Sequence, residues 1–308
     1  MITLLRVLIL SLGVLGIPSH GHSKPTADLS LPWVTLPAQA QRVTQRIFDS
    51  VAVGAPVSYH VYLPRSYSQG TDRLPVLYWL HGTEGGIAGI GPLSRFFDEA
   101  VEAGRFPPMI VVLVNGLPRR LWADSKDGAS PVETVFIQEV IPDVDRHFRT
   151  MASREGRIIE GFSMGGYGAA RLGLTYPHLF AGISILAGGP LDLEFQGPRA
   201  RHSPRLRDQI LREVCSGDLR YFRAISPWMA AESAASRLIG QSITIRQAIG
   251  AADDTIELTR RFRDHMDRLR VDHEYREIPG IGHDPLALIR GLEASSGRFF
   301  RKARGSQR

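Results

Sequence analysis

A serine flanked by glycines has the setting in which a side chain could do chemistry. Residues 161–165 read Gly-Phe-Ser-Met-Gly, so Ser163 lies in a G-x-S-x-G pattern. A short apolar run over 157–160 precedes the pattern, and a helical pattern over 164–176 follows it. A serine on such a tight strand-to-helix turn projects its hydroxyl above the sheet, as a nucleophile requires. The alternative interpretation is a glycine-rich helix start in which the serine is only an N-cap.

A serine hydroxyl is a poor nucleophile at neutral pH and needs a base beside it. In this arrangement of elements, an acid and then a histidine follow the serine along the chain. Of the ten histidines, His283 alone comes after the last predicted strand, in a glycine-containing loop just before a helix. A single loop histidine is usually a solvated side chain, but its position relative to Ser163 predicts that His283 is the base.

The acid that orients the histidine should follow the preceding strand, which is predicted over 242–249. Asp253 and Asp254 both lie there. A carboxylate at this point would accept the imidazole N–H and stabilise the imidazolium. The other aspartate would then cap the helix that begins near Ile256. We favour Asp253, although spacing alone leaves both residues open.

An oxyanion formed during attack needs backbone N–H donors. One donor should be Met164, the residue after the serine. The other should come from the loop 81–86, which follows an apolar run ending at Leu80, with Thr83 or Gly82 as the donor. Glycine-rich loops also bind phosphates, but neither nucleotide-binding glycine pattern is present here.

Short apolar runs alternate with amphipathic patterns along the rest of the chain. Such alternation predicts a mostly parallel sheet with helices on both faces and functional loops at the carboxyl ends of its strands. The predicted strands cover 57–63, 74–80, 109–114, 157–160, 182–186, 242–249 and 274–278, and the predicted helices cover 92–104, 133–149, 164–176, 256–269 and 285–300.

Two segments fall outside this alternation. Residues 24–45 are interpreted as a linker or a first hairpin. Residues from about 191 to 240 are too many for a simple crossover, so we interpret them as a cap-like insertion over the sheet edge. Five of its arginines crowd the stretch 199–212, and they either attract an anionic substrate or lie on a solvated helix face. They are Arg199, Arg201, Arg205, Arg207 and Arg212.

The overall composition is that of a globular protein. The chain has 308 residues, of which 43% are hydrophobic and 22% charged, enough to bury a sizeable core. The net charge of +6 is mild, and no recognisable nucleic-acid-binding module accompanies it, so we expect no nucleic-acid partner. The single cysteine, Cys215, excludes an intrachain disulfide and any multi-cysteine metal site.

The N-terminus has the features of a secretory signal. The apolar run from Val7 to Ile17 would rise about 16 Å as a helix, roughly half of a bilayer core. Small residues at Ser19, Gly21 and Ser23 could allow cleavage. We therefore expect a signal peptide over 1–23, a single domain over 24–308 without a stable membrane span, and export to the periplasm or out of the cell.

The region from Phe136 to Gly189 resembles the serine esterase (esterase D) family of α/β hydrolases. The likeness is strongest in the segment R-I-I-E-G-F-S-M-G-G-Y-G-A around Ser163, and it continues through His81-Gly82, Gly250–Asp253 and Gly282-His283. That family includes feruloyl and acetyl-xylan esterases, S-formylglutathione hydrolases and mycolyltransferases. The resemblance implies an α/β-hydrolase fold with Ser163 as nucleophile, His283 as base and Asp253 as acid, since the family's Gly-x-x-Asp pattern ends at Asp253.

The resemblance also bears on substrate contacts. It places the segment Trp122-Ala123-Asp124-Ser125 at the rim of the pocket, although Ala123 stands where many members carry an aromatic residue. Trp228, near a loop, is a further candidate for lining the pocket. The substrate-binding candidates are His81, Trp122, Asp124 and Trp228.

The expected activity is hydrolysis of a carboxylic ester through an acyl-enzyme. The substrate would be a small-molecule or carbohydrate-linked ester with a short acyl, acetyl or feruloyl-type group, and the reaction needs no metal or organic cofactor. Two alternatives stay open, namely an acyltransferase on the same scaffold and a non-catalytic envelope- or carbohydrate-binding protein. The sequence does not indicate an oligomeric state.

Overall fold

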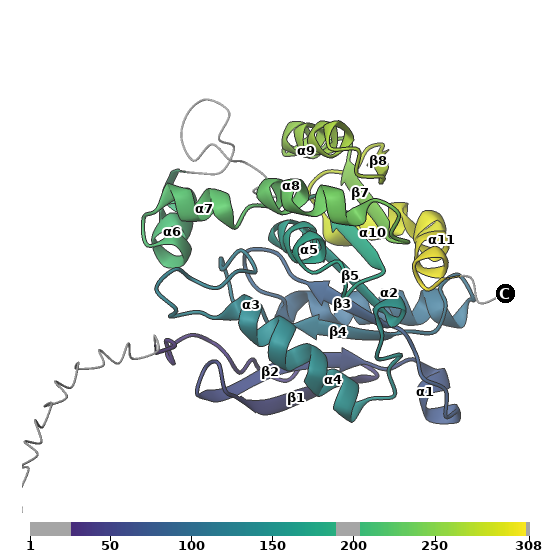
Figure 1. Cartoon of the computed structure of the whole chain (residues 1–308). Helices are drawn as coiled ribbons and strands as arrows, with labels where there is room; N and C mark the ends of the chain where they lie inside the picture. The colour runs from purple at the N-terminus through teal and green to yellow at the C-terminus, as the bar shows by residue number, and fades with distance from the viewer. Residues whose placement is uncertain (1–25, 189–203, 306–308) are drawn as a thin grey trace, which may run out of the picture.

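An eight-stranded sheet forms the centre of the computed structural model, which describes residues 26–188 and 204–305 (Figure 1). The strand order is β1-β2-β4-β3-β5-β6-β7-β8, and only the β1–β2 and β2–β4 pairs are antiparallel. The predicted, mostly parallel sheet is therefore confirmed. The strands are β1 (Val43–Ser50), β2 (Ala55–Tyr62), β3 (Val76–Leu80), β4 (Ile110–Val114), β5 (Arg157–Phe162), β6 (Gly182–Leu186), β7 (Thr244–Gly250) and β8 (Glu274–Ile278).

Helices cover both faces of this sheet. Every residue of β3, β4 and β6 is buried, which requires a packed layer on each side. Helices α5, α8 and α9 contribute to the core on one face, and α2, α10 and α11 to the core on the other (Figure 1). The helices are α1 (Arg65–Gln69), α2 (Ile87–Glu102), α3 (Val132–Thr134), α4 (Ile141–His147), α5 (Met164–Thr175), α6 (Pro204–Cys215), α7 (Leu219–Ala224), α8 (Pro227–Leu238), α9 (Ile256–Arg268), α10 (Pro285–Gly291) and α11 (Glu293–Ala303), with a π-helical turn η1 (Val135–Val140) between α3 and α4 and a 3-10 turn η2 (Arg154–Gly156) before β5.

A buried ion pair ties the central strands together. Glu160 on β5 and Arg246 on β7 are 1% and 2% exposed, and their side chains lie 2.6 Å apart. Ser184 on β6, between them, donates its hydroxyl to Glu160 and accepts a hydrogen bond from Arg246. Arg246 also donates to Ser296 on α11. This network fixes β5 against two strands and one helix, three residues before Ser163.

Several element assignments differ from the sequence prediction: helix α1 was not predicted, and the single helix predicted over 133–149 is α3, η1 and α4. Strand β1 was not expected, because residues up to 45 were interpreted as a linker or hairpin and the strand is an edge strand with mostly half-exposed side chains. The single helix predicted over 285–300 is two helices, α10 and α11, which meet at Leu292.

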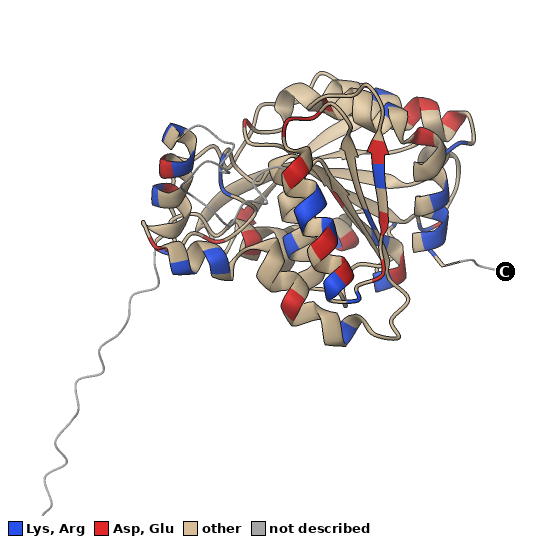
Figure 2. Ribbon diagram, turned by 90° about the horizontal axis from the view of Figure 1, so that it is seen from above, with Lys and Arg blue, Asp and Glu red and all other residues tan. Residues whose placement is uncertain are grey.

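The predicted insertion forms three helices in its described part. Helix α8 packs against α5, α7 and α9, and α6 packs against α7 (Figure 1). Helix α6 carries Arg205, Arg207 and Arg212 together with acidic residues, and Figure 2 shows basic and acidic residues interspersed on the outer helices. Residues 191–203 lie outside the described residues, so the rest of the predicted cap is not described.

The predicted signal peptide, residues 1–23, also lies outside the described residues and stays a prediction. Among the helices of 26–188 and 204–305, none combines the length and the apolar character needed to cross a bilayer.

Candidate active site

Ser163 lies at a sharp turn between β5 and α5. Its backbone has φ 58° and ψ −121°, a left-handed conformation that residues with side chains rarely adopt. The turn also requires Gly165, because a Cβ there would lie 1.9 Å from the carbonyl oxygen of Leu80 on the neighbouring strand. The G-x-S-x-G sequence thus forms the predicted elbow, with Ser163 at its tip.

The loops after β7 and β8 bring an acid and a histidine to this tip. A Cβ on Gly250 would lie 2.1 Å from the carbonyl oxygen of Ile281, so only glycine lets the two loops approach this closely. The Ala252 N–H donates to the same Ile281 oxygen at 2.9 Å. Asp284 caps α10 by accepting the N–H of Ala287, which ends the loop directly after His283.

Ser163, His283 and Asp253 form a continuous chain of hydrogen bonds. The Nε2 atom of His283 lies 2.9 Å from the Ser163 Oγ, and its Nδ1 atom lies 2.7 Å from an Asp253 oxygen. Because a carboxylate only accepts, Nδ1 carries the proton and Nε2 is left to accept the proton of the serine. The aromatic ring of Phe162 packs 4.7 Å from the imidazole ring and limits its movement.

Asp253 is the aspartate that contacts the histidine, and Asp254 is exposed beside it. Burial alone would raise the pKa of Asp253, but hydrogen bonds from His283 and from Thr255 outweigh it and lower that pKa below its ordinary value. Thr255 donates both its N–H and its hydroxyl to the second Asp253 oxygen, each at 2.8 Å. Thr255 was not predicted, although an aspartate two residues before a threonine at a helix start is typical of such a turn.

Unpaired backbone N–H groups lie next to the serine. Within the described residues, the N–H groups of Met164, Gly82 and Thr83 have no hydrogen-bond acceptor. Gly82 lies against Ser163, since a Cβ on it would be 3.6 Å from the serine Cβ. Among the described residues, the predicted donors are therefore not engaged by other protein groups.

A cavity of about 630 Å³ opens over Ser163. This is the size of a typical small-molecule site, and its wall combines apolar side chains with a few polar groups. The apolar part of the wall is formed by Trp79, Leu93, Phe162 and Pro285, and the rest by residues 82–86, His81, Gly89, Ser163, Asp254, Thr255 and His283.

Three predicted substrate contacts are not among the residues that line this cavity. The Trp122 side chain is fully buried beneath the loop 81–83. Asp124 accepts the N–H and hydroxyl of Thr134, so it holds the start of a helix. Trp228 packs against Phe262 and His265, where α8 meets α9. Sequence proximity to a loop did not reveal which partners these side chains contact.

The fourth candidate, His81, does line the cavity, but both of its ring nitrogens are engaged inside the protein. Nε2 lies 3.1 Å from the Gly116 nitrogen and Nδ1 lies 2.7 Å from the Gly82 oxygen. His81 therefore has no free polar atom for a substrate.

A metal does not fit the polar groups at this site. Asp253, Asp254 and His283 place possible ligand atoms within 4.8 Å of one another. Both nitrogens of His283 and both oxygens of Asp253 are, however, already used in hydrogen bonds with protein groups. These nitrogen and oxygen atoms are thus already occupied by hydrogen bonds within the protein.

Comparison with known proteins links this site to esterases. The family model described as "Putative esterase" matches residues 50–275. An endo-1,4-beta-xylanase/feruloyl esterase of Xylanibacter ruminicola is 32% identical over 168 residues, which are 51% of this chain and 23% of that protein. An esterase of Mycobacterium tuberculosis is 28% identical over 257 residues, which are 77% of this chain and 54% of that protein. The matches thus span from about a quarter to about half of these curated relatives.

Solved structures share the fold. A ferulic acid esterase superposes with a TM-score of 0.68 at 24% identity, over 85% of this chain and 98% of that one. An S-formylglutathione hydrolase from Agrobacterium tumefaciens superposes with a TM-score of 0.68 at 17% identity, over 85% of this chain and 95% of that one. The predicted α/β-hydrolase fold and the resemblance to a serine esterase family are both confirmed.

Proposed function

The chain belongs to the esterase family whose model matches residues 50–275. From this family membership we propose that the protein hydrolyses carboxylic esters through an acyl-enzyme on Ser163. The observation that carries the proposal is the unbroken hydrogen-bond chain from Ser163 through His283 to Asp253. Such a chain activates a hydroxyl that is otherwise unreactive at neutral pH.

In the first step the Ser163 oxygen attacks the ester carbonyl carbon. The hydroxyl proton passes to Nε2 of His283, which becomes an imidazolium facing the Asp253 carboxylate at 2.7 Å. The lowered pKa of Asp253 keeps this carboxylate ionised, so that its charge stabilises the imidazolium. The imidazolium then gives its proton to the alcohol oxygen as the ester bond breaks.

The developing oxyanion is held by backbone N–H groups. We assign Met164 and Thr83 as donors because both N–H groups lack acceptors within the described residues, Met164 follows Ser163 in the chain, and Thr83 lines the same cavity as Ser163. The Gly82 carbonyl is bonded to His81, and its peptide therefore directs the Thr83 N–H to the opposite side. Each such donor contributes on the order of 10²–10³ in rate.

Water completes the cycle. His283 removes a proton from a water molecule, the resulting nucleophile attacks the acyl carbon, and the acid leaves as Ser163 regains its proton. Every one of these proton transfers uses the same Nε2 atom. The cycle therefore needs only the three side chains and the two backbone donors.

The cavity supports an ester with an apolar acyl group. Trp79, Leu93, Phe162 and Pro285 form an apolar wall beside the serine, and 630 Å³ leaves room for an acyl group of aromatic size. A relative named as a feruloyl esterase is consistent with this size. We therefore propose acetyl, short-chain and feruloyl-type esters as substrates, carbohydrate-linked esters among them.

Replacement of the serine tests the proposal. Ser163→Ala should lower kcat for 4-nitrophenyl acetate on the order of 10⁶-fold and abolish labelling by a fluorophosphonate probe. Ser236→Ala, at an exposed position on α8, is the matched control and should leave both unchanged. Labelling or turnover retained in Ser163→Ala would refute the assignment, and transfer of the acyl group to an added alcohol in preference to water would identify an acyltransferase.

A further inference from the structure

His81 lies at the start of the loop that carries the proposed oxyanion donor, yet it offers the substrate no polar atom. We infer that His81 is a positioning residue, which orients the Thr83 N–H by binding the carbonyl of the same peptide. This inference rests on the proposed function, since it concerns the oxyanion stabilised during attack on the ester.

The tautomer of His81 follows from its partners. The Gly116 nitrogen carries a proton and donates it to Nε2, so Nε2 must be the unprotonated nitrogen. The neutral ring then has its proton on Nδ1, which donates to the Gly82 oxygen at 2.7 Å. Burial lowers the pKa of His81 to about 4, so the ring keeps this form throughout the neutral range.

The orientation of the Thr83 N–H follows from peptide geometry. The peptide between Gly82 and Thr83 is planar and trans, so its C=O and N–H point in opposite directions. With the Gly82 oxygen bound to His81 on one side, the Thr83 N–H must face the other side. Rotation of this peptide would break the hydrogen bond to His81 before it moved the donor away from the serine.

The segment 116–122 holds His81 and its loop in place through three hydrogen bonds. Besides the Gly116 N–H, the indole N–H of Trp122 donates to the His81 carbonyl at 3.2 Å, and the Arg119 N–H donates to the Thr83 carbonyl at 3.0 Å. Four residues of this segment have left-handed backbone, so backbone strain is concentrated in it. These are Leu117, Arg119, Leu121 and Trp122.

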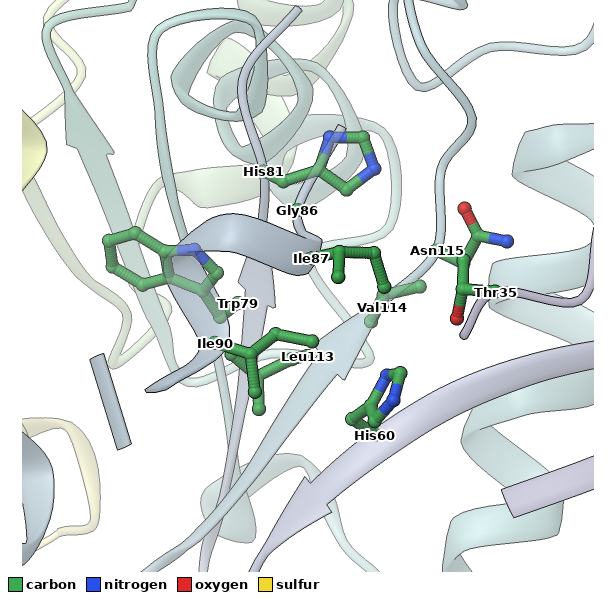
Figure 3. Close-up of a pocket in the computed structure, with 10 residues that line it drawn as sticks. All are labelled: Thr35, His60, Trp79, His81, Gly86, Ile87, Ile90, Leu113, Val114 and Asn115. Atoms are coloured by element: carbon green, nitrogen blue, oxygen red, sulfur yellow. The ribbon is translucent and has the colours of Figure 1, made fainter. Parts of the chain in front are cut away.

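The imidazole has little room to move. Its ring lies 4.9 Å from the Trp122 ring, and a Cβ on Gly86 would come within 3.0 Å of the His81 side chain. Trp79, His81 and Gly86 line both the main cavity and a smaller pocket, and Figure 3 shows the smaller one. That pocket has about 20 Å³ of space, enough for one water molecule but not for an acyl group. The buried side of His81 therefore supports the loop and binds no substrate.

Two substitutions separate positioning from simple packing. In His81→Asn the side-chain amide nitrogen occupies the place of Nδ1 and can still donate to the Gly82 oxygen, but the Gly116 N–H loses its acceptor. In His81→Gln the amide oxygen occupies the place of Nε2 and can still accept from Gly116, but the side-chain donor to the Gly82 oxygen is lost and only the longer hydrogen bond from the Gly85 N–H, at 3.3 Å, remains there. Each variant thus keeps one of the two hydrogen bonds.

The test is steady-state hydrolysis of 4-nitrophenyl acetate together with inhibition by an alkyl trifluoromethyl ketone. In the inhibited enzyme the serine oxygen bonds to the ketone carbon and the proton moves to His283, which leaves the same negative oxygen as in the reaction. We expect His81→Gln to lower kcat about 10- to 100-fold with KM changed less than about threefold, and to raise the ketone Ki in parallel. His81→Asn should keep kcat within about threefold of the unchanged protein, although its melting temperature should fall further than that of His81→Gln.

The outcomes distinguish the possible failures. Equal kcat in the two variants, or a kcat that follows the melting temperature, would overturn the positioning role of His81. If the unchanged protein is not inhibited by the ketone and Ser163→Ala keeps its activity, the proposed function itself is wrong. A rise in KM with kcat unchanged would instead show that His81 binds the substrate, which also refutes the inference.

Discussion

Replacing Asp253 by asparagine exchanges one atom in the hydrogen-bond chain and should remove nearly all activity. The Thr255 N–H and hydroxyl both donate to one Asp253 oxygen, so the amide oxygen of the asparagine must stay on that side. The amide NH₂ group then faces Nδ1 of His283. It donates to that nitrogen and moves the imidazole proton to Nε2, which can no longer accept the proton of Ser163.

The size of the effect can be worked out from this geometry. Restoring the productive tautomer would set donor against donor in a buried site, at a cost of about 1–3 kcal/mol. The variant also loses the attraction between the carboxylate and the imidazolium at 2.7 Å, which adds a few kcal/mol. A total of about 5 kcal/mol corresponds to a loss on the order of 10⁴-fold in kcat.

The assay is hydrolysis of 4-nitrophenyl acetate, with thermal unfolding as the check on the fold. Asp254→Asn is the matched control, because Asp254 lines the cavity but makes no hydrogen bond to His283. We expect that control to stay within about tenfold of the unchanged protein, since it alters only a nearby charge. A kcat of Asp253→Asn within tenfold of the unchanged protein, or an equal loss in Asp254→Asn, would contradict this role of Asp253.

Two further predictions concern stability. Glu160→Gln should lower the free energy of unfolding by about 3–5 kcal/mol in urea titrations, because it leaves Arg246 charged and without its ion-pair partner in the core. Adding Arg246→Met to this variant should restore part of the lost free energy. An unchanged urea midpoint in Glu160→Gln would contradict this account. For His81 the folded pKa of about 4 lies below the ordinary 6.5, so the unfolded chain takes up the proton first as the pH falls. Stability should drop by about 3 kcal/mol between pH 6.5 and 4, and His81→Asn should have a flatter profile in the same titration; identical profiles would argue against a buried neutral imidazole.

The sheet and its connections could be predicted because buried parallel strands are almost continuously apolar. Strand β6, in which every residue is buried, begins and ends where the sequence pattern does. Strand β1 was not predicted because it is an edge strand, and its partly exposed residues give no clear alternation. The break between α10 and α11 was missed for a related reason, since the apolar spacing continues across Leu292.

The polar groups around Ser163 could be anticipated from their order along the chain. That order puts Ser163, Asp253 and His283 at the carboxyl ends of three strands, which meet at one edge of a parallel sheet. The directions of Trp122 and Trp228 could not be anticipated, because a loop position does not reveal which way a side chain points. Trp122 turns inward at a residue with positive φ, and no local sequence pattern signals that conformation at a tryptophan.

At Ser163, whose backbone is left-handed, the stability of the fold and the presence of a hydroxyl have opposite requirements. Glycine would adopt the same conformation without the penalty of about 1–3 kcal/mol that a residue with a side chain incurs. Glycine at position 163 would therefore make the folded state more stable, but it would remove the hydroxyl. The serine at this position therefore costs stability that glycine would not, and the proposed role of its hydroxyl as nucleophile requires that cost.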